Sequence, residues 1–176
     1  LRSVIILGVF FFFFSSIVSA QGVDLLVFGL SGNPDTLDPQ KTAGTLTFQV
    51  VKSIYDTLVE PDQSGKIVPA LAESWSVSSD GLSWTFNLRR DVIFHNGQSF
   101  SSKDVAATLN RIMDEKTASP KRSDYSAIRE IRTPDAYTVI LMLSQPYAPL
   151  LATLASGWSA ILPSGLIASG HNFAAE

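Results

Sequence analysis

Few side chains in this chain are of a type and spacing suited to catalysis or metal binding. Asp35 and Asp38 are the closest pair of carboxylates in their region, and paired carboxylates can act as general acid and base. Both lie in the segment Pro34–Pro39, and an aspartate beside proline in a turn usually accepts backbone N–H groups. We therefore favour a turn-capping role over a catalytic one. His95 and His171 are far apart in sequence, and zinc needs three or four ligands, so we predict no metal site.

The usual sequence signatures of enzymes are missing. No serine stands in a G-x-S-x-G context or three residues before a lysine, and neither G-x-G-x-x-G nor G-x-x-x-x-G-K-[ST] occurs. The chain has no cysteine, which removes thiol nucleophiles, disulfides and thiolate metal sites. We predict no catalytic residues, no cofactor and no enzyme, unless the active residues lie in another part of the protein.

The first 20 residues have the layout of a secretory signal peptide. Arg2 is followed by the apolar run Val4–Phe14 and then by small residues ending in Val18-Ser19-Ala20. A membrane-spanning helix would need roughly 20 apolar residues, and here serines interrupt the run too early. Cleavage after Ala20 would leave Gln21 first, and a lipid anchor would need cysteine there. We expect an exported periplasmic protein that is not lipid-anchored.

The remaining chain is mildly acidic. Arg2 is the only charge in residues 1–20, so residues 21–176 carry 12 basic and 16 acidic side chains, a formal charge of −4. This balance provides no basic surface for nucleic acid or for anionic lipid. No low-complexity segment and no internal repeat follow the leader.

The stretch 71–111 contains the clearest structural signals. Apolar and polar residues alternate over 82–88, which predicts a half-buried strand between turns at Asp80-Gly81 and Asn96-Gly97. A short strand is expected over 92–94. Ser101 or Ser102 should cap a helix, with Asp104 in the position of a capping-box acid.

Outside this stretch the patterns predict a mixture of helices and strands. The segment 137–143 is apolar at alternate positions and partly apolar between them, which predicts a strand covered by a helix on one face. Trp75 and Trp84 are assigned to packing. The other expected elements are a buried strand over 25–30, a helix over 45–58, extended segments over 67–69 and 128–131, and a helix starting at Pro149.

The same stretch closely resembles the family 5 bacterial extracellular solute-binding proteins, the peptide and nickel class that serves ABC importers. That family shows P-x-L-A-x-S-W, D-G-x-x-x-x-F-x-L-R, V-x-F-x-x-G, D-V and R in this order, and P-x-T-L-D-P before them, as in Pro34–Pro39. The matching positions of the long run are Pro69, Leu71, Ala72, Ser74, Trp75, Asp80, Gly81, Phe86, Leu88, Arg89, Val92, Phe94, Gly97, Asp104, Val105 and Arg111.

The resemblance implies an α/β fold of the type II-like periplasmic binding proteins, in which two lobes close on a ligand. Family members are roughly three times longer than residues 21–176. The resemblance therefore implies a partial first lobe, with the first strand and loop of lobe I over 21–44, an inserted mixed α/β subdomain over 45–170, and the second lobe absent. The implied function is capture of peptides or related small solutes for delivery to an ABC permease, by a protein that is monomeric when full length.

The resemblance also places three segments at the ligand cleft. The first is Ala43-Gly44-Thr45-Leu46, where oligopeptide binders carry an acidic residue and this chain has Ala43. The second is Lys121 to Tyr125, where Lys121 stands in a place that relatives often give to an aromatic residue. Lys121 is either a solvated lysine or a partner for a ligand carboxylate. The third is Ser156-Gly157-Trp158-Ser159, and Trp158 either stacks on a ligand or packs under the last helix.

Two other functions remain open. An exported hydrolase could carry its active residues in a part of the protein beyond this sequence. A sensor or chaperone could use the same fold without transport. Cargo identity also stays open among peptides, metal chelates, sugars and opines.

Overall fold

The computed structural model describes residues 27 and 29–174. The expected signal peptide, residues 1–20, lies outside these described residues. Within the part of the chain described, no helix has both the length and the apolar character needed to span a membrane.

The alternating segment around Phe86 forms a central strand of a four-stranded antiparallel sheet, which confirms the predicted strand. In the order β3-β4-β6-β5, Phe86 pairs with Trp75 on one side and Val139 on the other. Gly81 has a φ of 71°, and the Asp80 carboxylate accepts the Leu82 amide at 2.9 Å, so this turn also forms as predicted. The strands are β3 (Ala72–Val77), β4 (Ser83–Leu88), β5 (Ile128–Asp135) and β6 (Thr138–Leu143).

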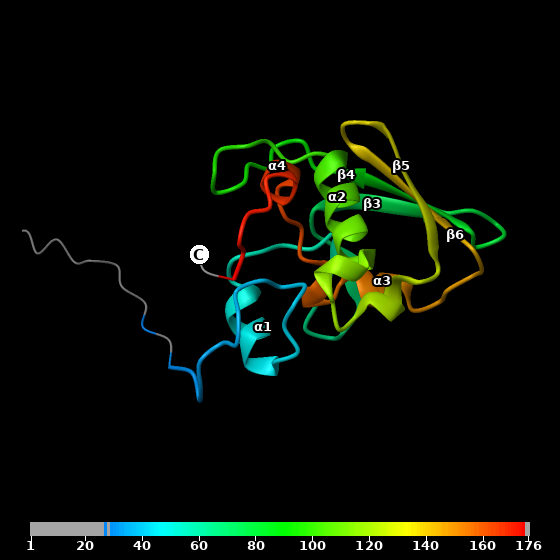
Figure 1. Cartoon of the computed structure of the whole chain (residues 1–176). Coiled ribbons are helices and arrows are strands. Elements are labelled where there is room, and N and C mark those ends of the chain that lie inside the picture. The colour runs from blue at the N-terminus through cyan, green and yellow to red at the C-terminus, as the bar shows by residue number, and fades with distance from the viewer. Residues whose placement is uncertain (1–26, 28, 175–176) are drawn as a thin grey trace, which may run out of the picture.

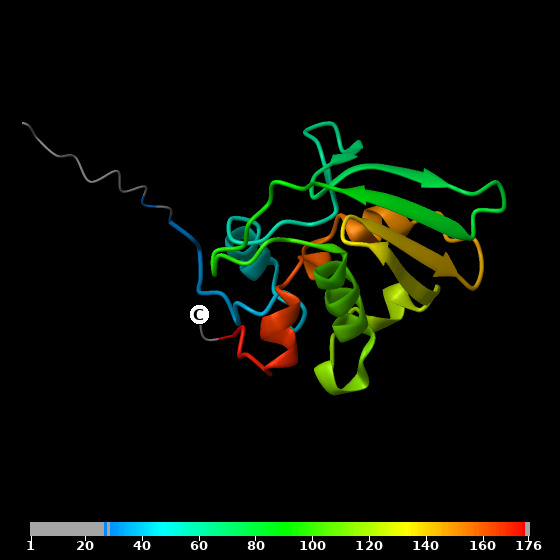
Figure 2. The ribbon, with the colours of Figure 1, turned by 90° about the horizontal axis from the view of Figure 1, so that it is seen from above.

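One face of the sheet is covered by the helix α2 (Ser102–Met113), as Figures 1 and 2 show. The Ser101 amide donates to the Asp104 carboxylate at 2.8 Å, which confirms the predicted capping box. The other oxygen of Asp104 accepts the Ser164 amide at 2.7 Å. The same carboxylate therefore starts α2 and holds the start of α4 (Ser164–Ala168).

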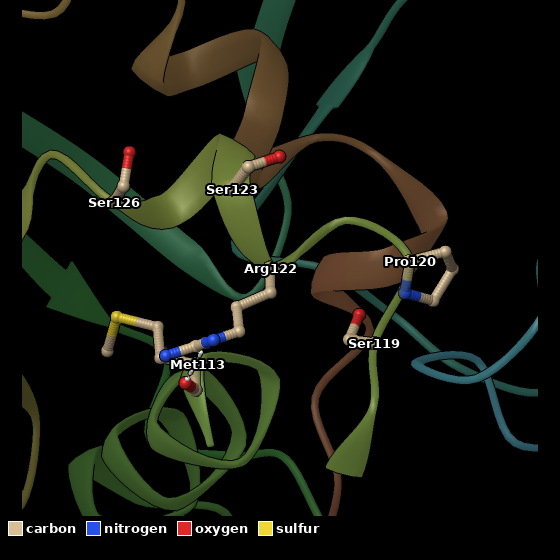
Figure 3. Close-up of a pocket in the computed structure, with 6 residues that line it drawn as sticks. All are labelled: Met113, Ser119, Pro120, Arg122, Ser123 and Ser126. Carbon is tan, nitrogen blue, oxygen red and sulfur yellow. Dashed lines mark hydrogen bonds between the residues drawn. The ribbon is translucent and has the colours of Figure 1, made fainter. Parts of the chain in front are cut away.

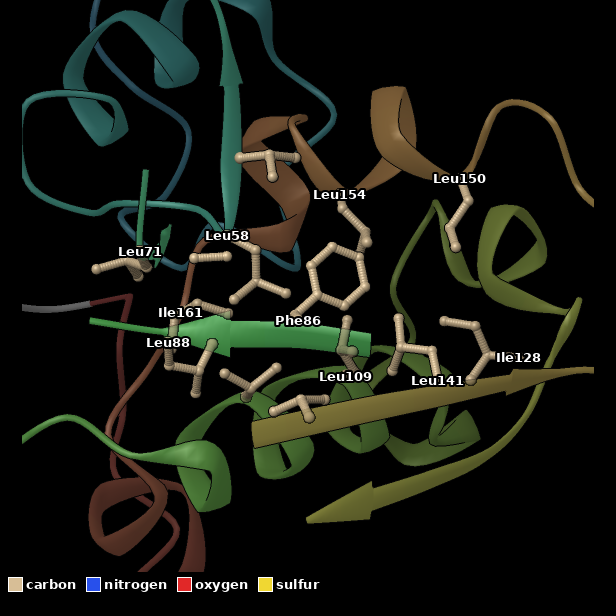
Figure 4. Close-up of a cluster of buried hydrophobic side chains, with 14 of the residues drawn as sticks. Leu58, Leu71, Phe86, Leu88, Leu109, Ile128, Leu141, Leu150, Leu154 and Ile161 are labelled. Carbon is tan, nitrogen blue, oxygen red and sulfur yellow. The ribbon is translucent and has the colours of Figure 1, made fainter. Parts of the chain in front are cut away.

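The core lies between α2 and the inner face of the sheet. Figure 4 shows Phe86 at its centre, with Leu109 of α2, Leu141 of β6 and Leu154 of α3 around it. The alternation predicted for β6 appears as buried Val139, Leu141 and Leu143. Trp75 and Trp84 are half-buried against this core, as assigned. Smaller elements complete the fold: β1 (Val59–Pro61), β2 (Ile67–Pro69), α3 (Leu150–Leu154) and the 3-10 turns Glu115–Thr117, Arg122–Tyr125 and Gly157–Ser159.

The helix expected over 45–58 is shorter than predicted. It is α1 (Thr45–Val51), and the chain turns after it and enters β1. The carbonyl of Leu58 accepts the amides of Ala70 and Ala72 at 3.3 and 2.8 Å, and the next residue, Val59, pairs with Pro69 in a β-ladder. Tertiary pairing of Leu58 therefore overrides the helical periodicity of the local sequence.

Two expected strands also differ from the structure. In the segment 25–30, the described residues 27, 29 and 30 form no strand, and Val27 is 80% exposed. A strand needs a neighbouring strand to pair with, and the described residues provide none there. The strand expected over 92–94 is reduced to a single bridge between Ile93 and Ser99, on either side of the predicted turn, where Gly97 has a φ of 83°.

The two ends of the described chain meet beside α2. The first and last described segments, blue and red in Figures 1 and 2, lie side by side in both views. Arg111 of α2 pairs with Asp38 at 2.6 Å, and its guanidinium lies 5.2 Å from the Phe173 ring centre. Both connections into this α/β unit are therefore fixed to the same helix.

Candidate functional site

Trp158 contacts Lys121 of the second expected segment, and Thr42 and Phe48, which flank the first expected segment, Ala43 to Leu46. Its indole N–H donates to the Thr42 carbonyl at 2.9 Å, and its ring meets the Phe48 ring edge-on, with centres 4.3 Å apart. The Lys121 ammonium lies 4.9 Å from the centre of the same ring. We call Thr42, Phe48, Lys121 and Trp158 the Trp158 cluster. It joins the loop before α1, the turn before Tyr125 and the turn after α3.

The Asp35 carboxylate shapes the loop that enters this cluster. One of its oxygens accepts the hydroxyl of Thr42 at 2.7 Å and the hydroxyl of Thr47. The hydrogen bond from Thr47, and then that from Thr42, lowers the pKa of the Asp35 carboxyl below its usual value. The Gly44 amide donates to the Thr42 hydroxyl at 2.9 Å. Asp35 therefore binds two threonine hydroxyls across the loop, and it fixes Thr42 where Trp158 binds.

The close contact between Phe48 and the turn at Gly157 requires glycine. A Cβ added to Gly157 would lie 2.3 Å from Cδ1 of Phe48, well inside the contact distance of real atoms. The absence of a side chain lets the ring of α1 approach the backbone that carries Trp158. The role of Phe48 is not predicted by the sequence pattern, because this residue lies off the apolar face expected for the helix.

Lys121 lies at the edge of the cluster and remains partly open to solvent. Its side chain is 40% exposed and its ammonium is 3.5 Å from the Asp124 carboxylate. Ala43, in the loop before α1, and Thr45, at the start of α1, are exposed, and Leu46 is half-buried. These residues carry no charge, whereas Lys121 is paired with Asp124.

Tyr125 and Ser159 lie inside the protein, each about 1% exposed. Their hydroxyls are 2.6 Å apart, and Ser159 also donates to the Thr153 carbonyl at 2.9 Å. Burial raises the pKa of the Tyr125 hydroxyl. In this structure the two residues support the turns that carry Lys121 and Trp158, and they do not face the surface.

A buried ion pair lies outside the expected site residues. Arg111 donates to both oxygens of Asp38, at 3.0 and 2.6 Å, and also to the side chain of Gln40. The Asp38 side chain is 3% exposed and that of Arg111 13%. Asp38 also accepts the Gln40 amide at 3.1 Å, so its turn-capping role is present as well. Both residues belong to the motifs quoted above, but no local pattern pairs residues 73 positions apart.

Three of the cavities that open on the described residues bear on the site. One of 430 Å³ is lined by Tyr55, Phe94 and Phe173 and brings His95 and His171 to the same wall. Among the described residues, no group of three or more His, Cys, Asp or Glu side chains is placed to hold a metal ion. A smaller cavity of 130 Å³ adjoins the Trp158 cluster and is lined by Phe48 and Gly157.

The third cavity, of 540 Å³, lies on the far side of the 3-10 turn that follows Lys121. Figure 3 shows Arg122 reaching across it to the end of α2, where its Nε donates to the Met113 carbonyl at 2.8 Å. The same guanidinium pairs with Glu115 at 3.0 Å. Since Arg122 is already bound within the protein, this cavity offers a ligand little unsatisfied charge.

Comparison with known proteins gives a consistent result. The profile of the bacterial extracellular solute-binding proteins, family 5 (Middle) matches residues 66–173. The glutathione-binding protein GsiB of Escherichia coli K12 is 33% identical over 137 residues, which is 78% of this chain and 27% of GsiB.

Solved structures agree with the sequence match. The binding protein AgaA of A. tumefaciens R10, in complex with agropinic acid, superposes with a TM-score of 0.76 and 41% identity, over 79% of this chain and 28% of AgaA. DppA of Helicobacter pylori, in complex with the peptide STSA, gives a TM-score of 0.70 and 31% identity, over 78% of this chain and 30% of DppA.

The chain belongs to the family 5 bacterial extracellular solute-binding proteins. Its mixed α/β fold is that of the type II-like periplasmic binding proteins, as predicted, over part of a domain. Members of this family are solute-binding proteins. The chain spans about a quarter of the length of the curated relatives that it matches.

Proposed function

We propose that this chain forms one wall of the ligand cleft in the substrate-binding component of an ABC importer. The observation that carries the proposal is the Trp158 cluster. Three loops, distant in sequence, meet at one indole ring on a rigid sheet-and-helix unit, which is the arrangement that binding sites commonly use. The family membership of the chain supports the same function.

The proposed cargo is a peptide or a related small solute. AgaA is in complex with agropinic acid, DppA with a peptide, and GsiB is named for glutathione. Ala43 to Leu46 would present backbone groups to an extended ligand, beside Trp158. Tyr125 and Ser159 would act from beneath, by holding the turns in place. The opposite wall of the cleft would come from a second lobe.

The proposed mechanism is capture by closure, with no bond made or broken in the ligand. An open state and a ligand-stabilised closed state exchange, and the closed state docks on the permease. We place the protein in the periplasm as a monomer. The leader-like sequence of residues 1–20 supports this location.

Thermal unfolding of the complete gene product tests this function. The panel comprises peptides of two to four residues, glutathione, opines, nickel chelates and sugars. A bound solute at 100 times its Kd should stabilise the protein by about 2.7 kcal/mol and raise the melting temperature. The solute should be recovered chemically intact by NMR.

A matched pair of variants tests whether the solute binds at the Trp158 cluster. Trp158→Ala removes the ring that joins the three loops, and solute affinity should fall. Trp84→Phe removes part of another half-buried indole in β4 and should leave affinity unchanged. Turnover of any panel member, or the absence of a stabilising solute in the whole panel, would contradict the proposal.

A further inference from the structure

We infer that Lys121 selects solutes that carry a carboxylate next to an apolar group. The inference rests on the proposed function, because it concerns the ligand class of the same wall. It depends on how the ammonium is held, on how much of its hydrogen-bonding capacity is used, and on what surrounds it.

The Lys121 ammonium is positioned before any ligand arrives. It lies 4.9 Å from the centre of the Trp158 ring, within the range of a cation–π interaction. The ring itself cannot turn freely, since its N–H donates to the Thr42 carbonyl and its edge meets Phe48. A lysine on an open surface loses considerable side-chain freedom when it binds a ligand. Here part of that ordering is already present in the fold.

The positioned ammonium has hydrogen-bonding capacity left. An ammonium has three N–H donors, and charge-assisted bonds to carboxylates are about 2.7–2.9 Å long. The Asp124 oxygen is 3.5 Å away, in an ion pair whose two side chains are 40% and 42% exposed. Such exposed pairs contribute little stability. A ligand carboxylate can therefore reach the ammonium without first breaking a strong internal bond.

The surroundings of Lys121 favour an anion with an apolar body. The adjoining loop contributes Ala43 and Gly44, which carry no charge. The nearby carboxylate of Asp35 is occupied by the hydroxyls of Thr42 and Thr47. Trp158 offers aromatic surface beside the ammonium, and the Phe48 ring extends this surface by meeting the indole edge-on. A carboxylate joined to an apolar side chain satisfies both parts of this surface.

Matched free acids and amides test the inference on the complete gene product. The probes are Ala-Phe, Ala-Ala-Phe and Ala-Ala-Ala-Phe, each with a free C-terminal carboxylate and as the C-terminal amide, titrated by calorimetry. The wild-type protein should bind the best acid at least about tenfold more tightly than its amide, as expected for a hydrogen bond to a charged group.

Variants at Lys121 show whether its ammonium causes the preference for the free acid. Lys121→Gln should abolish the preference for the acid and leave the affinity for the amide nearly unchanged, whereas Lys121→Arg should retain it. Lys116→Gln removes a charge from an exposed lysine in the preceding 3-10 turn and should behave as wild type. Circular dichroism melts should show that all variants fold.

The outcomes separate the inference from the function on which it rests. Three results would overturn the role of Lys121 and leave the transport function standing. They are equal binding of acid and amide by the wild-type protein, an acid preference that survives in Lys121→Gln, and binding of neither form while another solute of the wider panel binds. Failure of every solute in the wider panel would overturn both.

Discussion

Arg111 and Asp38 form the most deeply buried of the ion pairs found among the described residues. Their side chains are 13% and 3% exposed, whereas the partners in the Glu130–Arg132 pair are about half exposed. Removing one charge from a buried pair leaves the other in a site of low polarity, which is costly. The same change in an exposed pair costs little, because water replaces the lost partner.

We expect Asp38→Asn to lower the free energy of unfolding by about 3 kcal/mol. Asparagine keeps an oxygen that can accept the Gln40 amide, so the change tests the charge more than the turn. Glu130→Gln is the control and should cost less than about 1 kcal/mol. Urea unfolding of both variants at pH 7 provides the comparison. Equal stability of the two variants would show that the buried pair adds nothing.

At the scale of elements, sequence patterns predicted the centre of the fold better than its margins. The alternation around Phe86 and the cap at Ser101 are local signals, and the structure confirms β4 and the capping box. The pairing of the segment after α1 depends on hydrogen bonds from Ala70 and Ala72 to Leu58, which local periodicity does not encode. Local patterns thus predict the central elements here, whereas the segments 52–58 and 25–30 depend on tertiary partners.

In the candidate site, too, some residues were predicted from the sequence and others were missed. Lys121 and Trp158 were selected from the family resemblance, and the structure places them in contact. Phe48 was missed because nothing in its neighbourhood predicts a contact with Gly157. Whether Tyr125 and Ser159 face solvent could not be predicted from the sequence, because a hydroxyl in a loop can point into the protein or out to solvent.

The docking of α1 on the turn at Gly157 gives a prediction for this pair of elements. Gly157→Ala should destabilise the protein by about 1–3 kcal/mol, because the new methyl group would overlap the Phe48 ring. On a Phe48→Ala background the same change should cost much less, giving a coupling of about 1 kcal/mol or more.

Gly29→Ala is the control for this cycle, since a Cβ there meets nothing within 4 Å. It should be close to neutral in both backgrounds. Additive effects of Gly157→Ala and Phe48→Ala in urea unfolding would contradict a contact between them.

At the scale of the whole molecule, the unit exposes more apolar surface than its sheet and helices can cover. The 430 Å³ cavity is lined largely by apolar and aromatic side chains, and Ile93 on its wall is 67% exposed. Val77 on the edge strand β3 is 49% exposed. Exposed apolar surface of this kind usually belongs to an interface.

We therefore expect residues 21–176 alone to self-associate. Sedimentation velocity at increasing concentration should show growing aggregates, and Ile93→Ser should reduce them by removing an exposed apolar side chain. Lys66→Gln, at an exposed position in the β1–β2 hairpin, should not. A monodisperse species that melts cooperatively would contradict this expectation.

The meeting of both chain connections at Arg111 has an evolutionary consequence. A unit whose entry and exit are adjacent can be inserted into a host protein with little disturbance to either. Asp38 and Phe173, near the two ends of the described residues, both contact one guanidinium. The residues between them, Lys121 and Trp158 included, therefore have the adjacent ends that such an insertion needs.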